Sequence, residues 1–192
     1  WTHTYISPQG ERRMCCASRE KHSFQKQYID ATNDAKYGAV KESKTSADEF
    51  NPVSLDEHWN SDYMRAIRRK LMAGEQIPQC DVCNNDILSV SSYRQWFTGS
   101  LFNSKIDQAF DSTDATGYTT MKPISFDYRY SNLCNFKCRM CGEQLSSSWE
   151  TEKKLNDLWS PEQQPFMIAD VKTKMQSFQK DVVESEFKEA IS

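Results

Sequence analysis

One cysteine-rich stretch organises the sequence, and it reads Leu133-Cys134-Asn135-Phe136-Lys137-Cys138-Arg139-Met140-Cys141-Gly142. Its spacing, C-x3-C-x2-C, follows residues 122–130, which alternate between apolar and polar side chains as a strand does. Three thiolates on a loop that leaves a strand can ligate three irons of a [4Fe–4S] cluster. The spacing therefore predicts a cluster at Cys134, Cys138 and Cys141, with one iron open to a small-molecule ligand.

A zinc knuckle is the main alternative for these three cysteines. Zinc sites usually join two C-x2-C arms and close on four ligands. Here one arm already carries three cysteines, and it leads from the strand into a predicted helix at residues 143–158. Functional sites of α/β proteins are expected at such strand ends, so we favour the cluster.

Two further cysteine groups occur earlier in the chain, Cys15-Cys16 and Cys80-x2-Cys83. Adjacent cysteines point their side chains apart, so we expect one of Cys15 and Cys16 to bind a metal and the other to pack or remain free. The C-x2-C pair alone serves zinc, clusters and redox disulfides alike. Together the two groups predict a second metal site, either a second iron–sulfur cluster or zinc.

The size and charge of the chain limit the functional classes. Its 192 residues are enough for one domain or a domain and part of another. The net charge of −3 gives no general attraction to nucleic acid or to anionic membranes, and no run of 18 apolar residues predicts a membrane span. Grouped cysteines, odd in number, suggest metal binding in a reducing compartment, so we expect a cytoplasmic protein. The chain begins at Trp1 and stops at Ser192 inside an apolar-periodic segment, so we expect a fragment of a longer protein.

Local patterns predict an α+β chain. The expected elements are a β-hairpin at 1–16, a long polar loop at about 17–52 with a short helix at Ser23–Ala31, one helix from Ser54 to Gly74, a helix at 84–97, a polar linker at 111–120, a strand at 122–130, a helix at 143–158 and a final amphipathic segment. Trp59, Tyr63 and Ile67 recur at a spacing of four, which indicates a core-facing helix stripe.

Other polar groups are expected to be structural. We interpret a basic patch as the solvated face of a helix: Arg65, Arg68, Arg69 and Lys70. The three histidines stand apart and are expected at the surface or in the hairpin: His3, His22 and His58. No Ser–His–Asp set has a suitable spacing, so we predict no catalytic residues beyond the cluster ligands.

The hairpin with Cys15-Cys16, the Cys80-x2-Cys83 pair, Ser92-Tyr93-Arg94-Gln95 and residues 131–141 together resemble the twitch domain-containing radical S-adenosylmethionine (radical SAM) proteins. The resemblance implies a small twitch module at residues 1–120, similar to half of a SPASM domain and carrying an auxiliary iron–sulfur cluster. It also implies that residues 121–192 are the first βα unit of an incomplete radical SAM partial TIM barrel.

The resemblance further implies that S-adenosylmethionine chelates the open iron and yields a 5′-deoxyadenosyl radical. Its substrate would be a peptide, a protein or another molecule, and its electron donor a flavodoxin or ferredoxin. Met140 stands where many relatives have an aromatic residue facing the adenine, and the family's Gly-Gly-Glu motif does not occur. Only one barrel strand is found, so we expect a strand with two open edges and an inactive, poorly stable fragment.

From the residues themselves, Lys137 and Arg139 would balance the negative charge of the cluster, and the N-terminus of the helix after Gly142 would donate to its sulfurs. The alternative to the enzyme is a non-catalytic module in which the cysteines hold structural zinc.

Overall fold

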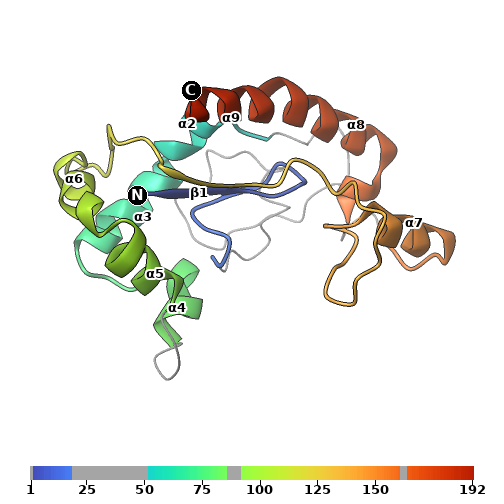
Figure 1. Ribbon diagram of the computed structural model, residues 1–192, viewed down its shortest axis with the longest axis horizontal. Helices are drawn as coiled ribbons and strands as arrows, with labels where there is room; N and C mark the ends of the chain where they lie inside the picture. Colours follow the sequence, from blue (N-terminus) through green and yellow to red (C-terminus); the bar gives the residue numbers. More distant parts are fainter. Residues whose placement is uncertain (1, 19–51, 86–91, 161–163) are drawn as a thin grey trace.

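The fold combines a small central sheet with helices at its two ends and along one side (Figure 1). The computed structural model describes the chain in four segments, residues 2–18, 52–85, 92–160 and 164–192. In these segments the sheet has three strands, β1 (His3–Ile6), β2 (Arg12–Arg13) and β3 (Ser125–Tyr128). The α-helices are α2 (Leu55–Trp59), α3 (Asp62–Met72), α4 (Asp81–Asn85), α5 (Tyr93–Trp96), α6 (Ile106–Asp111), α7 (Ser147–Leu155), α8 (Ala169–Phe178) and α9 (Glu184–Ile191). The predicted α+β class is confirmed.

The N-terminal hairpin is confirmed. β1 and β2 pair antiparallel, with Ile6 opposite Arg12. The amide of Gly10 donates to the carbonyl of Ser7 at 2.9 Å, which closes the predicted turn, and Gly10 has a positive φ of 78°. Glycine adopts this backbone conformation without the steric cost that a Cβ would add.

The expectation that the later strand would have two open edges is wrong. β3 pairs in parallel with β1, and His3 lies opposite Ser125 while Ile6 lies opposite Tyr128. Parallel strands need a long crossover, and the residues between β1 and β3 are ample for one. The strand is also shorter than the predicted 122–130. Its pairing joins the residues assigned to the barrel to the sheet of the N-terminal hairpin.

The single helix predicted from Ser54 to Gly74 is two helices. Ser54 and Glu57 form a capping box at the start of α2, and the side chain of Ser61 caps α3 by accepting from Met64 N at 3.3 Å. A second capping residue within the pattern starts a new helix. Both helices keep the predicted stripe toward the interior, where Trp59, Tyr63, Met64, Ile67, Ile77 and Cys80 form one core cluster.

The predicted polar linker at 111–120 is an ordered turn packed on α3. Thr113 and Thr119 bridge antiparallel, and the amide of Thr119 donates to Asn60. Arg68 donates to the carbonyl oxygens of Trp59 at 2.6 Å and Gly117 at 3.2 Å. Arg68 is 1% exposed, so its assignment to a solvated face is wrong. Its Nη atoms donate to these carbonyls and to Asn60 Oδ1, while its buried Nε has no partner among the described residues; the helix pattern alone does not reveal these contacts.

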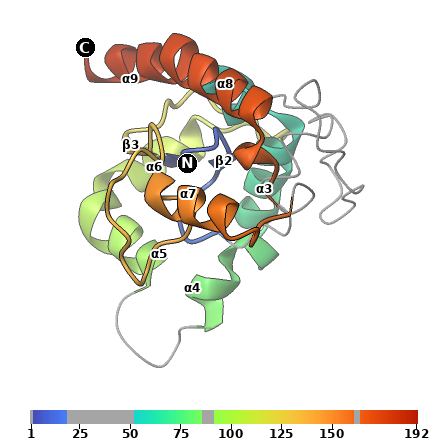
Figure 2. The same cartoon turned by 90° about the vertical axis from the view of Figure 1, so that its right-hand side faces the viewer.

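The C-terminal helices form one continuous rod, in which a π-helical segment (Gln179–Val183) joins α8 to α9 (Figure 2). Glu186 of α9 fixes this rod to the sheet. Its carboxylate accepts from the buried side chain of Arg12 at 2.5 Å, from the amide of Leu55 at 2.6 Å and from Tyr128 Oη at 3.4 Å. A carboxylate shared by three donors from three elements fixes their relative positions.

The helix predicted at 143–158 is shorter, because residues 143–145 form a turn and α7 spans Ser147–Leu155. Across the described segments, no helix combines the length and apolar character that crossing a membrane requires. Most of the predicted loop at 17–52, with the helix at Ser23–Ala31 and His22, lies outside the described residues, as does part of the predicted helix at 84–97.

Gly117 is the position where an added methyl group is least tolerated. It has a φ of +81°, and a Cβ there would overlap the carbonyl of Arg65. We expect Gly117→Ala to lower the free energy of unfolding by at least about 2 kcal/mol in chemical denaturation. Gly99→Ala is the control, because a Cβ at Gly99 meets nothing within 4 Å. Equal stability of the two variants would contradict the packing of this turn.

His58 makes stability depend on pH. It is buried, contrary to the surface expectation, and burial, followed by the positive charges of Arg12 and Arg68, lowers its pKa to about 3. Below pH 6.5 His58 becomes protonated in the unfolded chain but stays neutral in the folded chain. The free energy of unfolding therefore falls as the pH drops toward 3. Wild type should lose about 1.4 kcal/mol more than His58→Gln between pH 7.5 and 5.5. If the free energy of unfolding of the two proteins had the same pH dependence, the burial of a neutral His58 would be contradicted.

Candidate metal centres

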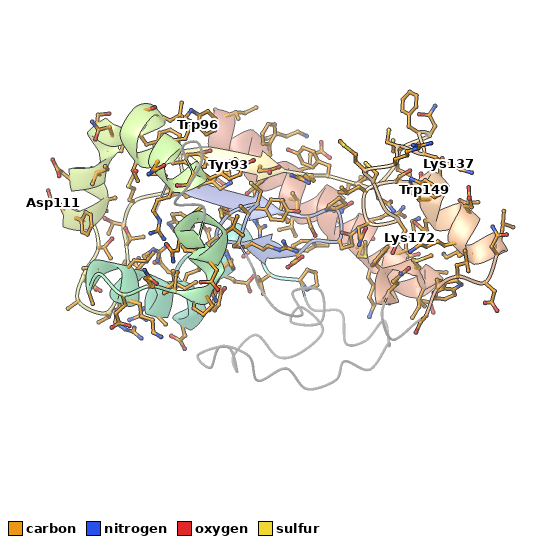
Figure 3. The ribbon with its side chains drawn as sticks, turned by 90° about the horizontal axis from the view of Figure 1, so that it is seen from below. Tyr93, Trp96, Asp111, Lys137, Trp149 and Lys172 are labelled. Carbon is orange, nitrogen blue, oxygen red and sulfur yellow. The ribbon has the colours of Figure 1, made fainter. Side chains whose placement is uncertain are left out.

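The cysteines gather in two places. One is a cavity between the hairpin, α3 and the arm formed by α4, α5 and α6, which we call the cysteine cavity. The other is residues 133–142, the cysteine loop, which follows β3 and packs against α7. In Figure 3, Lys137 and Trp149 mark the loop at one end of the molecule, and Tyr93, Trp96 and Asp111 mark the arm toward the other.

The cysteine cavity has a volume of about 340 Å³ and a mostly apolar wall. All four early cysteines line it: Cys15, Cys16, Cys80 and Cys83. The hairpin supplies the first pair, because its turn reverses the chain and returns β2 beside β1. The second pair sits where the chain leaves α3 and enters α4, after a turn that begins at Pro78. The structure thus brings together two groups that lie more than sixty residues apart.

Cys15 shares the cavity wall with the C-x2-C pair. Burial raises the pKa of Cys15 to about 11; a hydrogen bond from the Ala17 amide opposes this rise, and the neighbouring thiols of Cys16, Cys80 and Cys83 add smaller increases. Burial also raises the pKa of Cys80. Without a cation these thiols stay protonated, and a bound metal would deprotonate them.

Cys16 has a different electrostatic environment. After burial, the charges that act most on its pKa are those of Asp127, which raises it, and Arg129, which lowers it. Asp127 and Arg129 form an ion pair at 3.1 Å along β3. The two adjacent cysteines thus have different charged neighbours, and the expectation that only one of them binds a metal stays a prediction.

Two polar residues of the cavity were not identified from the sequence. Nδ1 of His3 lies 2.8 Å from Ser125 Oγ, whereas its Nε2 atom is buried without a hydrogen-bond partner among the described residues. Arg94, on α5, lines the cavity and hydrogen-bonds to the thiol of Cys80. The capping box that starts α5, Ser92 with Gln95, was readable as S-x-x-Q and would have placed Arg94 in a first helical turn.

The cysteine loop is held by the start of α7. The hydroxyl of Ser146 donates to the carbonyl of Phe136 at 2.6 Å, and Ser147 Oγ donates to the carbonyl of Cys134 at 3.1 Å. Nε1 of Trp149 donates to the carbonyl of Cys138 at 3.1 Å. The serines thus fix the loop backbone, with Cys138 exposed and Cys134 and Cys141 partly exposed.

The other predicted loop residues are placed as follows. Lys137 forms an ion pair with Glu152, and Arg139 is exposed. Met140 is 96% exposed, so its side chain is available to a ligand rather than packed. Gly142 precedes the turn of residues 143–145, and its carbonyl accepts from Leu145. The helix N-terminus expected directly after Gly142 begins only at Ser147, with Ser146 as its cap.

The donor chemistry of both places fits an iron–sulfur cluster. All seven cysteines are free thiols, and thiolate is the usual ligand of such clusters. Over the described segments, no three His, Cys, Asp or Glu side chains are close enough to hold a single metal ion. The ligand roles of the individual cysteines stay a prediction.

Comparison with known families bears on the first of these places. Residues 1–84 match the SPASM family of iron-sulfur cluster-binding domains. The matched residues include the hairpin, α2, α3 and all four cysteines of the cavity. The match supports a twitch- or SPASM-like module at this end of the chain, with an iron–sulfur cluster as its ligand. No curated protein and no solved structure matches the chain significantly.

Proposed function

We propose that this chain is part of a radical SAM enzyme and binds two iron–sulfur clusters, an auxiliary one in the cysteine cavity and a SAM-binding one at the cysteine loop. The observation that carries the proposal is that Cys15, Cys80 and Cys83, all within the SPASM-matching residues, line one cavity. The support for the second cluster is the C-x3-C-x2-C spacing on a loop that leaves a parallel strand.

In the cavity, Cys15, Cys80 and Cys83 would hold the auxiliary cluster. They come from the hairpin, from the turn before α4 and from α4 itself, so the cluster would join these elements. The apolar wall formed by residues such as Met64, Ile67 and Phe97 excludes water, and exclusion of water tunes the potential of a bound cluster. Cys16 is the remaining thiol and would stay unligated beside Asp127 and Arg129.

At the loop, Cys134, Cys138 and Cys141 would ligate three irons and leave the fourth to the amino and carboxylate groups of S-adenosylmethionine. The cluster supplies one-electron reduction, and the cofactor supplies a 5′-deoxyadenosyl radical. The chain itself would orient the cluster ligands, because the side chains of Ser146, Ser147 and Trp149 donate hydrogen bonds to carbonyl oxygens of the cysteine loop. We take a peptide or protein as substrate and a flavodoxin or ferredoxin as electron donor from the resemblance alone.

Anaerobic loading with iron and sulfide tests the proposal. Wild type should take up two clusters, and the triple variant Cys134→Ala, Cys138→Ala, Cys141→Ala should keep one. The variant Cys15→Ser, Cys80→Ser, Cys83→Ser should also keep one. Iron and sulfide content, optical spectra and paramagnetic resonance of the reduced protein measure the outcome. Added S-adenosylmethionine should change the resonance signal of wild type and of the cavity variant, but not that of the loop variant.

Cys16→Ser is the matched control, because it removes the thiol next to Cys15. Since Cys16 is not a proposed ligand, this variant should retain both clusters. Loss of the auxiliary cluster in this variant would reverse the assignment of Cys15 and Cys16. Stoichiometric zinc with no cluster in wild type would support the non-catalytic zinc module instead and would overturn the enzyme proposal.

A further inference from the structure

Arg94 occupies a defined position beside the proposed auxiliary cluster. It lies in α5, whose start is fixed by the capping box of Ser92 and Gln95. Its side chain lines the cysteine cavity together with Cys80 and Cys83, and it donates through Nη1 to Asn84 Oδ1 at 3.3 Å. The guanidinium group is thus held against α4, which carries Cys83, and it lies close enough to Cys80 for its charge and hydrogen bonding to lower the pKa of that thiol.

The charge of Arg94 is not neutralised locally. Among residues 2–18, 52–85, 92–160 and 164–192, no carboxylate lies within ion-pair distance of its guanidinium. An arginine stays protonated in proteins and offers five N–H donors, of which the contacts with Cys80 and Asn84 use only a part. Over the described residues, a full positive charge without an acidic partner thus lines the cysteine cavity.

The other arginine of the cavity is engaged differently. Arg68 donates to the carbonyls of Trp59 and Gly117 and to Asn60 Oδ1, so its donors are directed to the turn at 112–120 and not to a thiol. Arg94 is the cavity arginine that the structure directs to a cysteine sulfur.

We propose that Arg94 is a positioning residue that donates an N–H···S hydrogen bond to the Cys80 ligand and raises the reduction potential of the auxiliary cluster. This inference rests on the proposed auxiliary cluster. Reduction adds one electron, and hence one negative charge, to the cluster and its thiolates. A cation and a hydrogen bond at the sulfur stabilise that added charge, so the reduced state is favoured. Arg94 lies on α5, beyond the SPASM-matching residues that carry the ligands, so the potential depends on how α5 is docked against them.

A redox titration of the cluster-loaded chain tests this inference, with dithionite as the one-electron reductant and paramagnetic resonance as the readout. The loop triple variant of Cys134, Cys138 and Cys141 serves as background, so that only the auxiliary cluster is observed. Arg94→Gln should lower the reduction equilibrium constant at least tenfold, which is 59 mV for one electron. Arg94→Lys keeps the charge and should recover part of the loss.

Lys105→Gln is the matched control, because Lys105 is an exposed cation on the same arm that does not line the cavity. It should leave the potential unchanged. A second readout separates tuning from folding. The proton coupling to the reduced cluster that disappears on transfer to deuterated buffer should be weaker in Arg94→Gln than in the background protein. The iron content of the two proteins should be equal.

An unchanged potential and unchanged proton coupling in Arg94→Gln, with the cluster present, would overturn the role of Arg94 and leave the proposed function intact. Absence of any cluster in the background protein, with Arg94 in place, would overturn the auxiliary cluster and this inference together.

Discussion

The parallel pairing of β1 with β3 is the constraint on which the rest of the structure depends. It joins the N-terminal hairpin to a strand that lies far along the sequence, with Ile6 opposite Tyr128. One side of this pair leads through the hairpin to Cys15, and the end of β3 leads to the cysteine loop. Glu186 reinforces the pairing, because its carboxylate binds Arg12 from β2 and Tyr128 from β3. Both candidate metal centres are therefore fixed to one small sheet rather than to two independent domains.

Buried polar contacts fix the turn that follows α6, the last helix of the arm that lines the cysteine cavity. Arg68 joins α3 to the turn after α6 through backbone carbonyls, and Asn60 holds the same turn through Thr119. Buried charged groups are costly unless their donors are satisfied, so this packing has few alternatives. The consequence for function is a cavity whose wall is completed by residues that lie far from the cysteines in sequence, Arg94 among them.

Local patterns predicted much of this arrangement. The Pro–Gly turn of the hairpin, the Trp59–Tyr63–Ile67 stripe and the strand before the cysteine loop all follow from short-range rules. The β1–β3 pairing could not be predicted, because strand partners far apart in sequence leave no local signal. The burial of Arg68 and His58 was missed for the same reason, since their surroundings come from distant elements. Of the candidate sites, the cysteine groups were evident from spacing, whereas the meeting of Cys15 and Cys16 with Cys80 and Cys83 at one cavity, and the place of Arg94 in its wall, required the tertiary fold.

The central claim is that the cysteines of the cavity hold a cluster of iron atoms. Anomalous diffraction at the iron absorption edge, from crystals of the anaerobically loaded chain, tests it most directly. The account predicts a multi-iron density peak in the cavity, bonded to Cys15, Cys80 and Cys83, with the guanidinium of Arg94 beside the Cys80 sulfur. A single-atom peak at the zinc edge in that place, or a disulfide between any of these cysteines, would contradict it.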